Sequence, residues 1–152
     1  MRIRMTSFFP DVNVWLALSD GKSPHNKVCW KWFRTISPDA HLFFCRVTQI
    51  GLLRLLSNQA VMGSETLTLE DAWRAYDFWT SDPRVELRTE PHGIDATFRD
   101  TAMHFGRQPA SKMVGDCYLL AYAAECGATL VTFDKGLLDL ARKRGYAAIC
   151  PV

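Results

Sequence analysis

Residues 115–136 read GDCYLLAYAAECGATLVTFDKG, and this stretch decides how the chain is expected to fold. Its first half has the composition of a buried helix, with Asp116 near the start and a glycine as a stop signal. Residues 130–132 then read as a short buried strand, and Asp134 follows it. Two carboxylates on consecutive elements indicate a site, and Asp11 near the N-terminus is the candidate for a third member.

Outward from this stretch, apolar strand patterns alternate with helical patterns along the chain. Strands are expected at residues 6–9, 41–45, 85–87, 130–132 and 147–150. Besides the helix that opens the quoted stretch, helices are expected at residues 12–18, 25–36, 48–58, 68–81, 95–105 and 137–144, with a linker at 60–68. The alternation predicts an α/β fold with a mostly parallel central sheet of four to five strands flanked by helices. Because ligands of such sheets bind outside the carboxyl ends of the strands, the three acids are expected to gather on one edge.

Length and composition restrict the class of protein. A chain of 152 residues has the usual size of one domain, so residues 1–152 are expected to form a single domain. The formal charge of +2 permits a nucleic-acid partner without indicating one. The five cysteines show no CxxC spacing and are expected to be reduced thiols. With no signal peptide and no apolar run long enough to span a membrane, the protein is expected to be cytoplasmic and to have no membrane partner.

Carboxylates that meet in one place need compensation. Two unit charges about 4 Å apart repel each other by on the order of 4 kcal/mol at an effective dielectric constant near 20. Either one acid takes a proton or a cation lies between them. Mg²⁺ and Mn²⁺ take oxygen ligands and commonly combine one or two carboxylates with waters and substrate phosphates. The acids therefore favour metal-assisted phosphoryl chemistry, in which the metal lowers the pKa of an attacking water, over glycoside hydrolysis.

Three segments of the chain resemble, in family order, the PIN-domain ribonucleases, and specifically the VapC toxins of type II toxin–antitoxin pairs. They are DVNVWLAL at 11–18, VTQIGLLRLL at 47–56, and the quoted stretch at 115–136. The second segment is similar to the TQxGxLRLL pattern of a VapC-like subgroup. The resemblance implies a single PIN-like domain over residues 1–152 that acts as a metal-dependent endoribonuclease on structured RNA such as tRNA or rRNA. It also implies a VapB-like antitoxin as partner and a homodimer.

The resemblance carries over to three catalytic acids and three supporting residues. The acids are Asp11, Asp116 and Asp134, of which the first two would bind Mg²⁺ or Mn²⁺. The supporting residues are Asn13, Thr132 and Thr48. Hydrogen bonds from Asn13 and Thr132 would orient the acids.

One position departs from the family pattern. Many PIN domains have a glutamate three residues after the threonine of the second segment, and here that position is Gly51. Glu90, a loop residue before a proline, is the first candidate to replace this glutamate, and the alternative is a solvated loop acid. Arg54 is the one charged residue in an otherwise apolar helix. It is interpreted either as a phosphate contact or as an arginine whose charged end reaches solvent.

Other functions remain open at this point. The missing glutamate at Gly51 also fits a catalytically weak PIN-like module that binds RNA or a protein. An acid after the first strand fits a phosphatase or phospho-acceptor domain, although haloacid-type phosphatases have a second aspartate where this chain has Asn13. Asp11 and Asp134 also fit helix N-caps. The four histidines show no metal-ligand spacing and are assigned no chemistry.

Overall fold

The computed structural model describes residues 6–152, and its centre is a five-stranded sheet in which all neighbouring strands are parallel. The strands are β1 (Ser7–Pro10), β2 (His41–Phe44), β3 (Val85–Leu87), β4 (Thr129–Val131) and β5 (Ala148–Ile149), and their order across the sheet is β3-β2-β1-β4-β5. The predicted α/β fold with a parallel central sheet is therefore confirmed. Residues 1–5, on which the expectation of no signal peptide partly rests, lie outside the described part of the chain.

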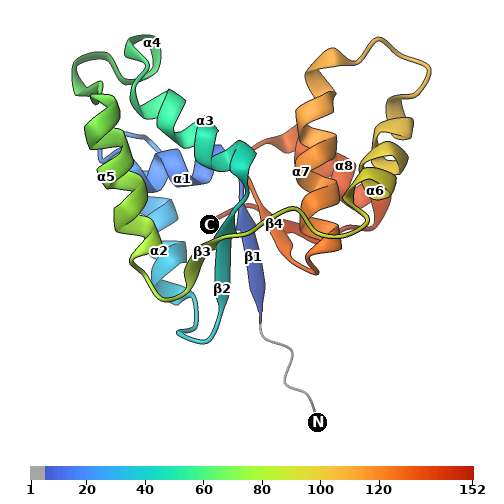
Figure 1. The fold of residues 1–152 in the computed structure, drawn as a ribbon, viewed down its shortest axis with the longest axis horizontal. Helices are drawn as coiled ribbons and strands as arrows, with labels where there is room; N and C mark the ends of the chain where they lie inside the picture. Colours follow the sequence, from blue (N-terminus) through green and yellow to red (C-terminus); the bar gives the residue numbers. More distant parts are fainter. Residues whose placement is uncertain (1–5) are drawn as a thin grey trace.

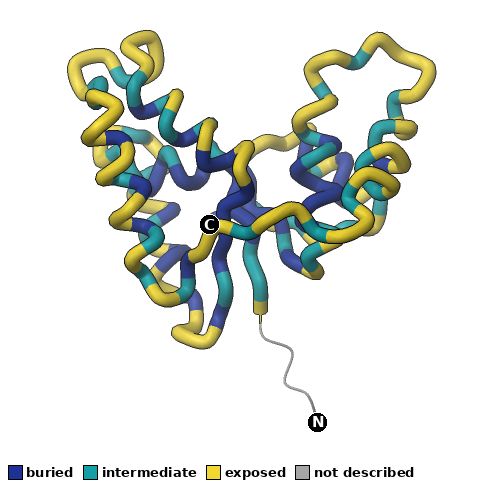
Figure 2. Tube along the Cα trace, in the orientation of Figure 1, coloured by how far each residue is buried: buried dark blue, intermediate teal, exposed yellow. Residues whose placement is uncertain are grey.

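Helices cover both faces of the sheet (Figure 1). One face is covered by α1 (Val12–Ser19), α2 (Asn26–Thr35), α3 (Arg46–Leu56) and α5 (Leu69–Thr80). The other face is covered by α6 (Ile94–Ala102), α7 (Val114–Glu125) and α8 (Lys135–Arg144). Figure 2 shows the buried residues concentrated along the strands and the inner sides of these helices.

The strands are apolar on both sides because each side meets a separate core. In β2, Leu42 and Phe44 pack into the core with α1 and α5, whereas Phe43 packs into the core with α7 and α8. Successive side chains of a strand point to opposite faces, so this alternation follows from the pleat. A sheet covered on both faces reads in sequence as a continuous apolar run, and residues 41–45 were predicted to be a strand on that basis.

Two short helical segments were missed at the sequence level. The expected linker at residues 60–68 contains most of α4 (Gln59–Met62) and all of η1 (Gly63–Glu65), so the expectation of a linker there was wrong. The side chain of Asn58 caps α4 by accepting a hydrogen bond from the Ala60 amide. A helix of one turn is too short to show an apolar period of 3.6 residues, which explains the miss. Two further 3₁₀ turns, η2 (Met103–Phe105) and η3 (Ser111–Met113), precede α7.

The direction in which strands are added to the sheet reverses between β1 and β4. From β1 the chain moves outward through β2 to β3, and it then returns to place β4 on the other side of β1. Such a reversal is where ligands bind in open parallel sheets, beyond the carboxyl ends of the strands. Pro10 pairs with Val131, and the Asp11 amide donates to the Val131 carbonyl at 2.8 Å, so the residues that follow β1 and β4 emerge together. Within residues 6–152, no helix is long and apolar enough to cross a bilayer.

Candidate active site at the carboxyl ends of β1 and β4

Asp11 is a buried carboxylate held by two hydrogen bonds. Its side chain is 7% exposed and caps α1, with Oδ1 accepting from the Val12 amide at 2.7 Å. Oδ2 accepts from the Thr132 hydroxyl at 2.9 Å. Burial raises the pKa of Asp11, the two hydrogen bonds lower it, and the negative charge of Asp134 raises it further. Asp11 is therefore the N-cap of α1, and its second carboxylate oxygen contacts the residue that follows β4.

Thr132 connects the residues that follow the two strands. It is fully buried, and besides donating to Asp11 its hydroxyl oxygen accepts from the Asp134 amide at 3.1 Å. The Asn13 amide nitrogen lies 3.4 Å from the same oxygen and donates to it. A threonine hydroxyl has one hydrogen to donate and two lone pairs to accept with, so these three contacts use its full capacity. Thr132 thus bonds to Asp11 directly, whereas Asn13 is connected to that acid only through Thr132.

Asp134 follows β4 and begins α8. Its backbone is extended, and its Oδ1 accepts from the Leu137 amide at 3.1 Å, which makes it the N-cap of that helix. The helix therefore begins two residues earlier than predicted. The side chain is exposed, so one carboxylate oxygen serves the cap while the group faces solvent at the sheet edge.

Asp116 lies in the first turn of α7 and is only partly buried. Its pKa is raised to about 6, chiefly by burial and then by the negative charges of Asp134 and Asp11. The carboxylate is therefore within electrostatic reach of both other acids, as expected for residues that gather at one edge. In the described part of the chain, however, no three His, Cys, Asp or Glu side chains are arranged closely enough to hold one metal ion.

The residues at this edge fit a hard divalent cation by their chemistry. All three acids offer oxygen ligands. Burial, followed by the negative charges of Asp134 and Asp11, raises the pKa of Asp116, so the ionised form of this carboxylate lacks a compensating positive charge. In addition, Oδ1 of Asn13 is a buried acceptor that finds no hydrogen-bond partner among residues 6–152. A cation such as Mg²⁺ or Mn²⁺ would compensate the charge, and oxygen ligands suit it.

Gly51 lies where α3 passes α1. A Cβ atom added to Gly51 would come within 3.0 Å of Cγ2 of Val12, the residue that follows Asp11. Any larger side chain at this position would have to displace Val12. The absence of the glutamate that many PIN domains have is thus associated with a close contact between the two helices.

Glu90, the expected replacement, lies elsewhere on the sheet edge. Its carboxylate accepts a hydrogen bond of 2.8 Å from the Tyr118 hydroxyl. Asp116 and Tyr118 are two positions apart on α7, so their side chains leave the helix on different sides. The charge of Glu90 is also not among those that raise the pKa of Asp116. The structure therefore does not bring Glu90 together with the three acids.

The other two predicted residues, Thr48 and Arg54, make no hydrogen bond to the three acids among residues 6–152. Thr48 is buried in the first turn of α3, where its hydroxyl and the Cys45 backbone and thiol form a capping box. Thr48 thus stabilises the N-terminus of α3. Arg54 is exposed in the last turn of the same helix and takes part in no salt bridge among the described residues.

Two arginines that the sequence analysis did not single out lie beyond β2 and β3. Arg46 and Arg88 line a cavity of about 310 Å³ together with Glu90 and Tyr122. Arg46 donates to Gln49 at 2.6 Å, and Arg88 lies over the ring of Phe43. Both follow strands almost directly, so the rule that identified Asp11 and Asp134 would also have found them.

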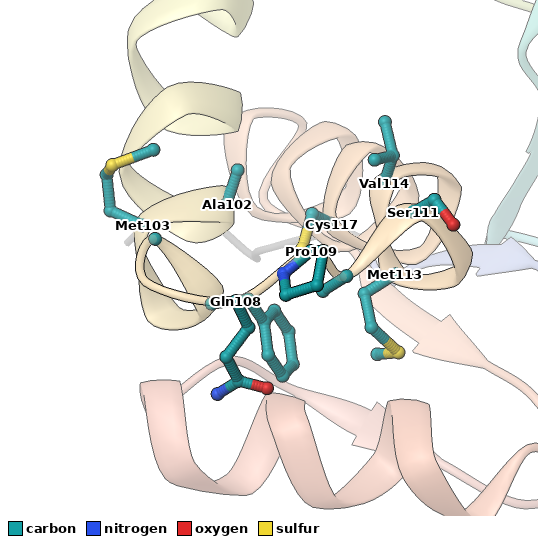
Figure 3. Close-up of a pocket in the computed structure, with 11 residues that line it drawn as sticks. Ala102, Met103, Gln108, Pro109, Ser111, Met113, Val114 and Cys117 are labelled. Carbon is teal, nitrogen blue, oxygen red and sulfur yellow. The ribbon is translucent and has the colours of Figure 1, made fainter.

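Two further cavities lie against the helices on opposite faces of the sheet. One of about 490 Å³ is bounded by Asn13 and Phe133 of the acid edge and by His25, to which no role was assigned from the sequence. The other, of about 460 Å³, lies between α6 and the start of α7 and is lined mainly by apolar groups. Figure 3 shows Met103 and Met113 on either side of Pro109 in this second cavity. It contains none of the candidate acids.

Comparison with known proteins gives a consistent assignment. The PIN-domain family model matches residues 8–143. Ribonuclease VapC41 of Mycobacterium tuberculosis is 41% identical over 128 residues, covering 82% of this chain and 86% of that protein. Ribonuclease VapC39 of the same organism is 30% identical over 139 residues, covering 86% of this chain and 91% of that protein.

Solved structures share the fold at low sequence identity. VapBC2 from Rickettsia felis, bound to a promoter DNA fragment, superposes with a TM-score of 0.71 at 11% identity, covering 95% of this chain and 98% of that chain. VapBC-1 from nontypeable Haemophilus influenzae gives 0.69 at 16% identity, with the same coverage. VapC20 of M. tuberculosis, a toxin that cleaves the sarcin–ricin loop, gives 0.64 at 14% identity, covering 87% and 93%. The chain therefore belongs to the PIN-domain family, among its VapC-type members.

Proposed function

We propose that this chain is the toxin of a VapBC-type pair and acts as a Mg²⁺- or Mn²⁺-dependent endoribonuclease on structured RNA, tRNA or rRNA. The observation that carries the proposal is the hydrogen-bonded connection of Asp11, Thr132 and Asp134 beyond the carboxyl ends of β1 and β4. The negative charges of Asp134 and Asp11 also act on Asp116, whose pKa they raise in addition to the effect of burial. The curated relatives VapC41 and VapC39 are ribonucleases, which supports the activity. We take residues 1–152 to form one PIN domain.

In this proposal each residue of the site has a distinct task. Asp11 and Asp116 hold the metal, and Asp134 adds negative charge beside them. Thr132 fixes the orientation of the Asp11 carboxylate, because its hydroxyl donates to Oδ2 while Val12 holds Oδ1. When bound, the metal neutralises charge on the scissile phosphate and lowers the pKa of the attacking water.

A polyanionic substrate also needs cationic contacts outside the acid site. Arg46 and Arg88 lie at the same sheet edge, beyond the neighbouring strands β2 and β3. Arginine forms bidentate hydrogen bonds with phosphate, so we assign both residues to the RNA backbone. Arg54, exposed on α3, is a further candidate for a phosphate contact.

Exposed apolar side chains support the proposal that this chain binds other proteins. Several large apolar residues on α3 and α5 are between 44% and 64% exposed, namely Val47, Ile50, Leu69, Trp73 and Phe78. Exposed apolar surface of this kind is typical of protein interfaces. The structural neighbours from H. influenzae and R. felis are VapBC complexes. We therefore propose a VapB-like antitoxin and a second copy of the chain as partners.

The nuclease proposal is tested with purified protein and total tRNA, with Mn²⁺ and with excess chelator. The informative variants are Asp116→Asn and Asp134→Asn, because asparagine keeps the shape of each side chain and the N-cap of α8 while removing the charge. Asp139→Asn, an exposed acid on α8, is the matched control. We expect cleavage by the wild type and by the control only with Mn²⁺, and a loss of at least about 100-fold in both site variants.

Cleavage that persists in chelator, or that survives both site substitutions, would contradict the proposal. The second candidate function is an RNA-binding PIN module without catalysis, which the glycine at position 51 favours. It predicts retarded tRNA in a gel-shift assay with no metal-dependent product. The two candidates are thus separated by one pair of measurements on the same wild-type sample.

A further inference from the structure

A cavity of about 490 Å³ adjoins the acid edge on the side of α1 and α2. Its walls include Asn13, whose amide donates to Thr132, and Phe133, which stands between Thr132 and Asp134. Two residues of the cavity wall are therefore direct neighbours of the acid site in space and in sequence. The opposite walls come from the loop after α1 and from α4 and η1. A group held in this cavity would be anchored next to the carboxylates.

One wall of the cavity is an aromatic platform. The rings of His25 and Phe133 are stacked, with centroids 4.3 Å apart and an interplanar angle of 21°. His25 is the N-cap residue of α2, yet its side chain makes no capping hydrogen bond and is exposed. The imidazole therefore contributes little to the helix end and offers a free face. Stacked aromatic rings with a free face are the usual support for a splayed nucleobase.

The polar groups of the cavity are mainly acceptors. Asp20 contributes a carboxylate, one oxygen of which accepts from the Lys22 amide at 3.0 Å. The ammonium group of Lys22 itself is paired with Glu65 across the rim at 2.6 Å. A carboxylate repels phosphate, but it accepts hydrogen bonds well from an amino group.

From these features we infer that the cavity is a nucleobase subsite, which accepts an unstacked base carrying an exocyclic amino group. Adenine, cytosine and guanine present such a donor, whereas uracil does not. The base would belong to a nucleotide beside the scissile phosphate, so this inference rests on the proposed ribonuclease function. The subsite would position flexible RNA at the acids and would favour cleavage at loops, where bases can leave the stack.

The subsite is tested by binding alone, without cleavage. The ¹⁵N-labelled wild-type protein is titrated with AMP, CMP, GMP and UMP in chelator and followed by ¹H–¹⁵N correlation spectra. We expect the three amino-bearing nucleotides to shift the amide signals of Lys22, His25 and Phe133. UMP should bind about three- to tenfold more weakly, the value of one hydrogen bond. Ribose 5-phosphate is the probe for a phosphate-only contact and should leave these signals unchanged.

Variants identify the platform and the acceptor. His25→Ala should weaken binding of the three nucleotides about tenfold. The matched control is His104→Ala, which removes another exposed histidine beside a phenylalanine, outside this cavity. It should bind like the wild type. Asp20→Asn keeps an acceptor of the same shape but removes its charge. The difference in affinity between the amino-bearing nucleotides and UMP should therefore become smaller in this variant.

Each outcome decides the inference separately from the nuclease proposal. Metal-dependent cleavage of tRNA together with no nucleotide-induced shifts at the cavity would overturn the subsite and leave the nuclease in place. Nucleotide binding at the cavity without tRNA cleavage would support the subsite, overturn the nuclease proposal and indicate an RNA-binding module. Equal binding of UMP, or equal shifts by ribose 5-phosphate, would overturn the choice of an amino-bearing base. If a VapB-like antitoxin shifts these signals and no nucleotide does, the cavity is a protein contact and the inference is wrong.

Discussion

The Thr132 hydroxyl donates a hydrogen bond of 2.9 Å to the carboxylate of Asp11, joining two residues that are 121 positions apart. Both residues are buried, and they meet because β1 and β4 are neighbours that end at the same edge. The contact therefore links the fold directly to the proposed chemistry. Removing this hydrogen bond should lower both stability and activity, whereas a substitution that keeps the hydroxyl group should have a smaller effect.

Thr132→Val replaces the hydroxyl by a methyl group of similar size. The buried Asp11 carboxylate loses one of its two hydrogen bonds, so we expect a loss of about 1 to 3 kcal/mol in the free energy of unfolding. Urea denaturation followed by circular dichroism measures this loss. Thr132→Ser retains the hydroxyl and should lie much closer to the wild type. Equal unfolding midpoints for the valine variant and the wild type would show that the hydrogen bond is unimportant.

Asp116 should make the metal-free protein less stable at neutral pH. Its pKa is about 6 in the folded protein against 3.8 ordinarily, because burial and the charges of Asp134 and Asp11 disfavour the ionised form. The folded state thus binds its proton more tightly than the unfolded state. The contribution of this group to stability falls as the pH rises from about 4 through 6, and it stays low above that.

The measurement is a comparison of Asp116→Asn with the wild type in chelator across this pH range. We expect the variant to be more stable at pH 7.5 by on the order of 1 kcal/mol, after allowance for partial solvent exposure. The difference should shrink towards zero near pH 4. Asp139→Asn, an exposed acid of α8, should show no such trend. A variant that gains no stability at pH 7.5 would contradict the raised pKa of Asp116 in the folded protein.

Gly51 and Val12 should be energetically coupled. Gly51→Ala gains about 1 kcal/mol of helix propensity, but its new Cβ would lie 3.0 Å from Cγ2 of Val12. We therefore expect little or no gain in the wild-type background. In a Val12→Ala background, which removes the obstructing methyl groups, the gain should appear. A double-mutant cycle by urea denaturation should give a coupling energy above about 0.5 kcal/mol, whereas additive effects would show that the helices adjust freely.

Arg46 should contribute to RNA affinity through charge. Arg46→Gln removes one cation from the sheet edge beyond β2, so tRNA binding should weaken and depend less on salt. The slope of log K against log salt should decrease by about 1. Fluorescence anisotropy with labelled tRNA in chelator measures both. The matched control is Arg99→Gln, an exposed arginine of α6 paired with Asp95, and an equal change of slope in it would indicate a nonspecific charge effect.

The sequence allowed the sheet and its acids to be predicted because both depend on local signals. Buried parallel strands appear as short apolar runs, and Asp11 and Asp134 could be placed since each follows such a run directly. Asn13 and Thr132 were expected from the family resemblance to orient the acids; Thr132 bonds to Asp11 directly, whereas Asn13 bonds to Thr132. These residues lie within two or three positions of a strand end, where backbone topology alone determines their neighbourhood.

What the sequence could not indicate depends on contacts between distant side chains. The stacking of His25 on Phe133 joins residues of different layers, and neither residue has a neighbour in sequence that suggests it. Glu90 was chosen from its loop context, but the tyrosine that binds it comes from α7. The close approach of Gly51 to Val12 is likewise a property of helix packing. Such contacts form only in the assembled fold, so no local sequence pattern predicts them.

The pairing of β1 with β4 also determines when the proposed active site can exist during synthesis. In a nascent chain Asp11 is synthesised 121 residues before Thr132, and Asp134 follows two residues later. Closing a contact over 121 positions cannot precede the synthesis of its second partner. The site is therefore incomplete until almost the whole described chain has left the ribosome. A polypeptide that stops short of β4 carries the first acid without its hydrogen-bonding partner, so interrupted translation yields no complete nuclease site.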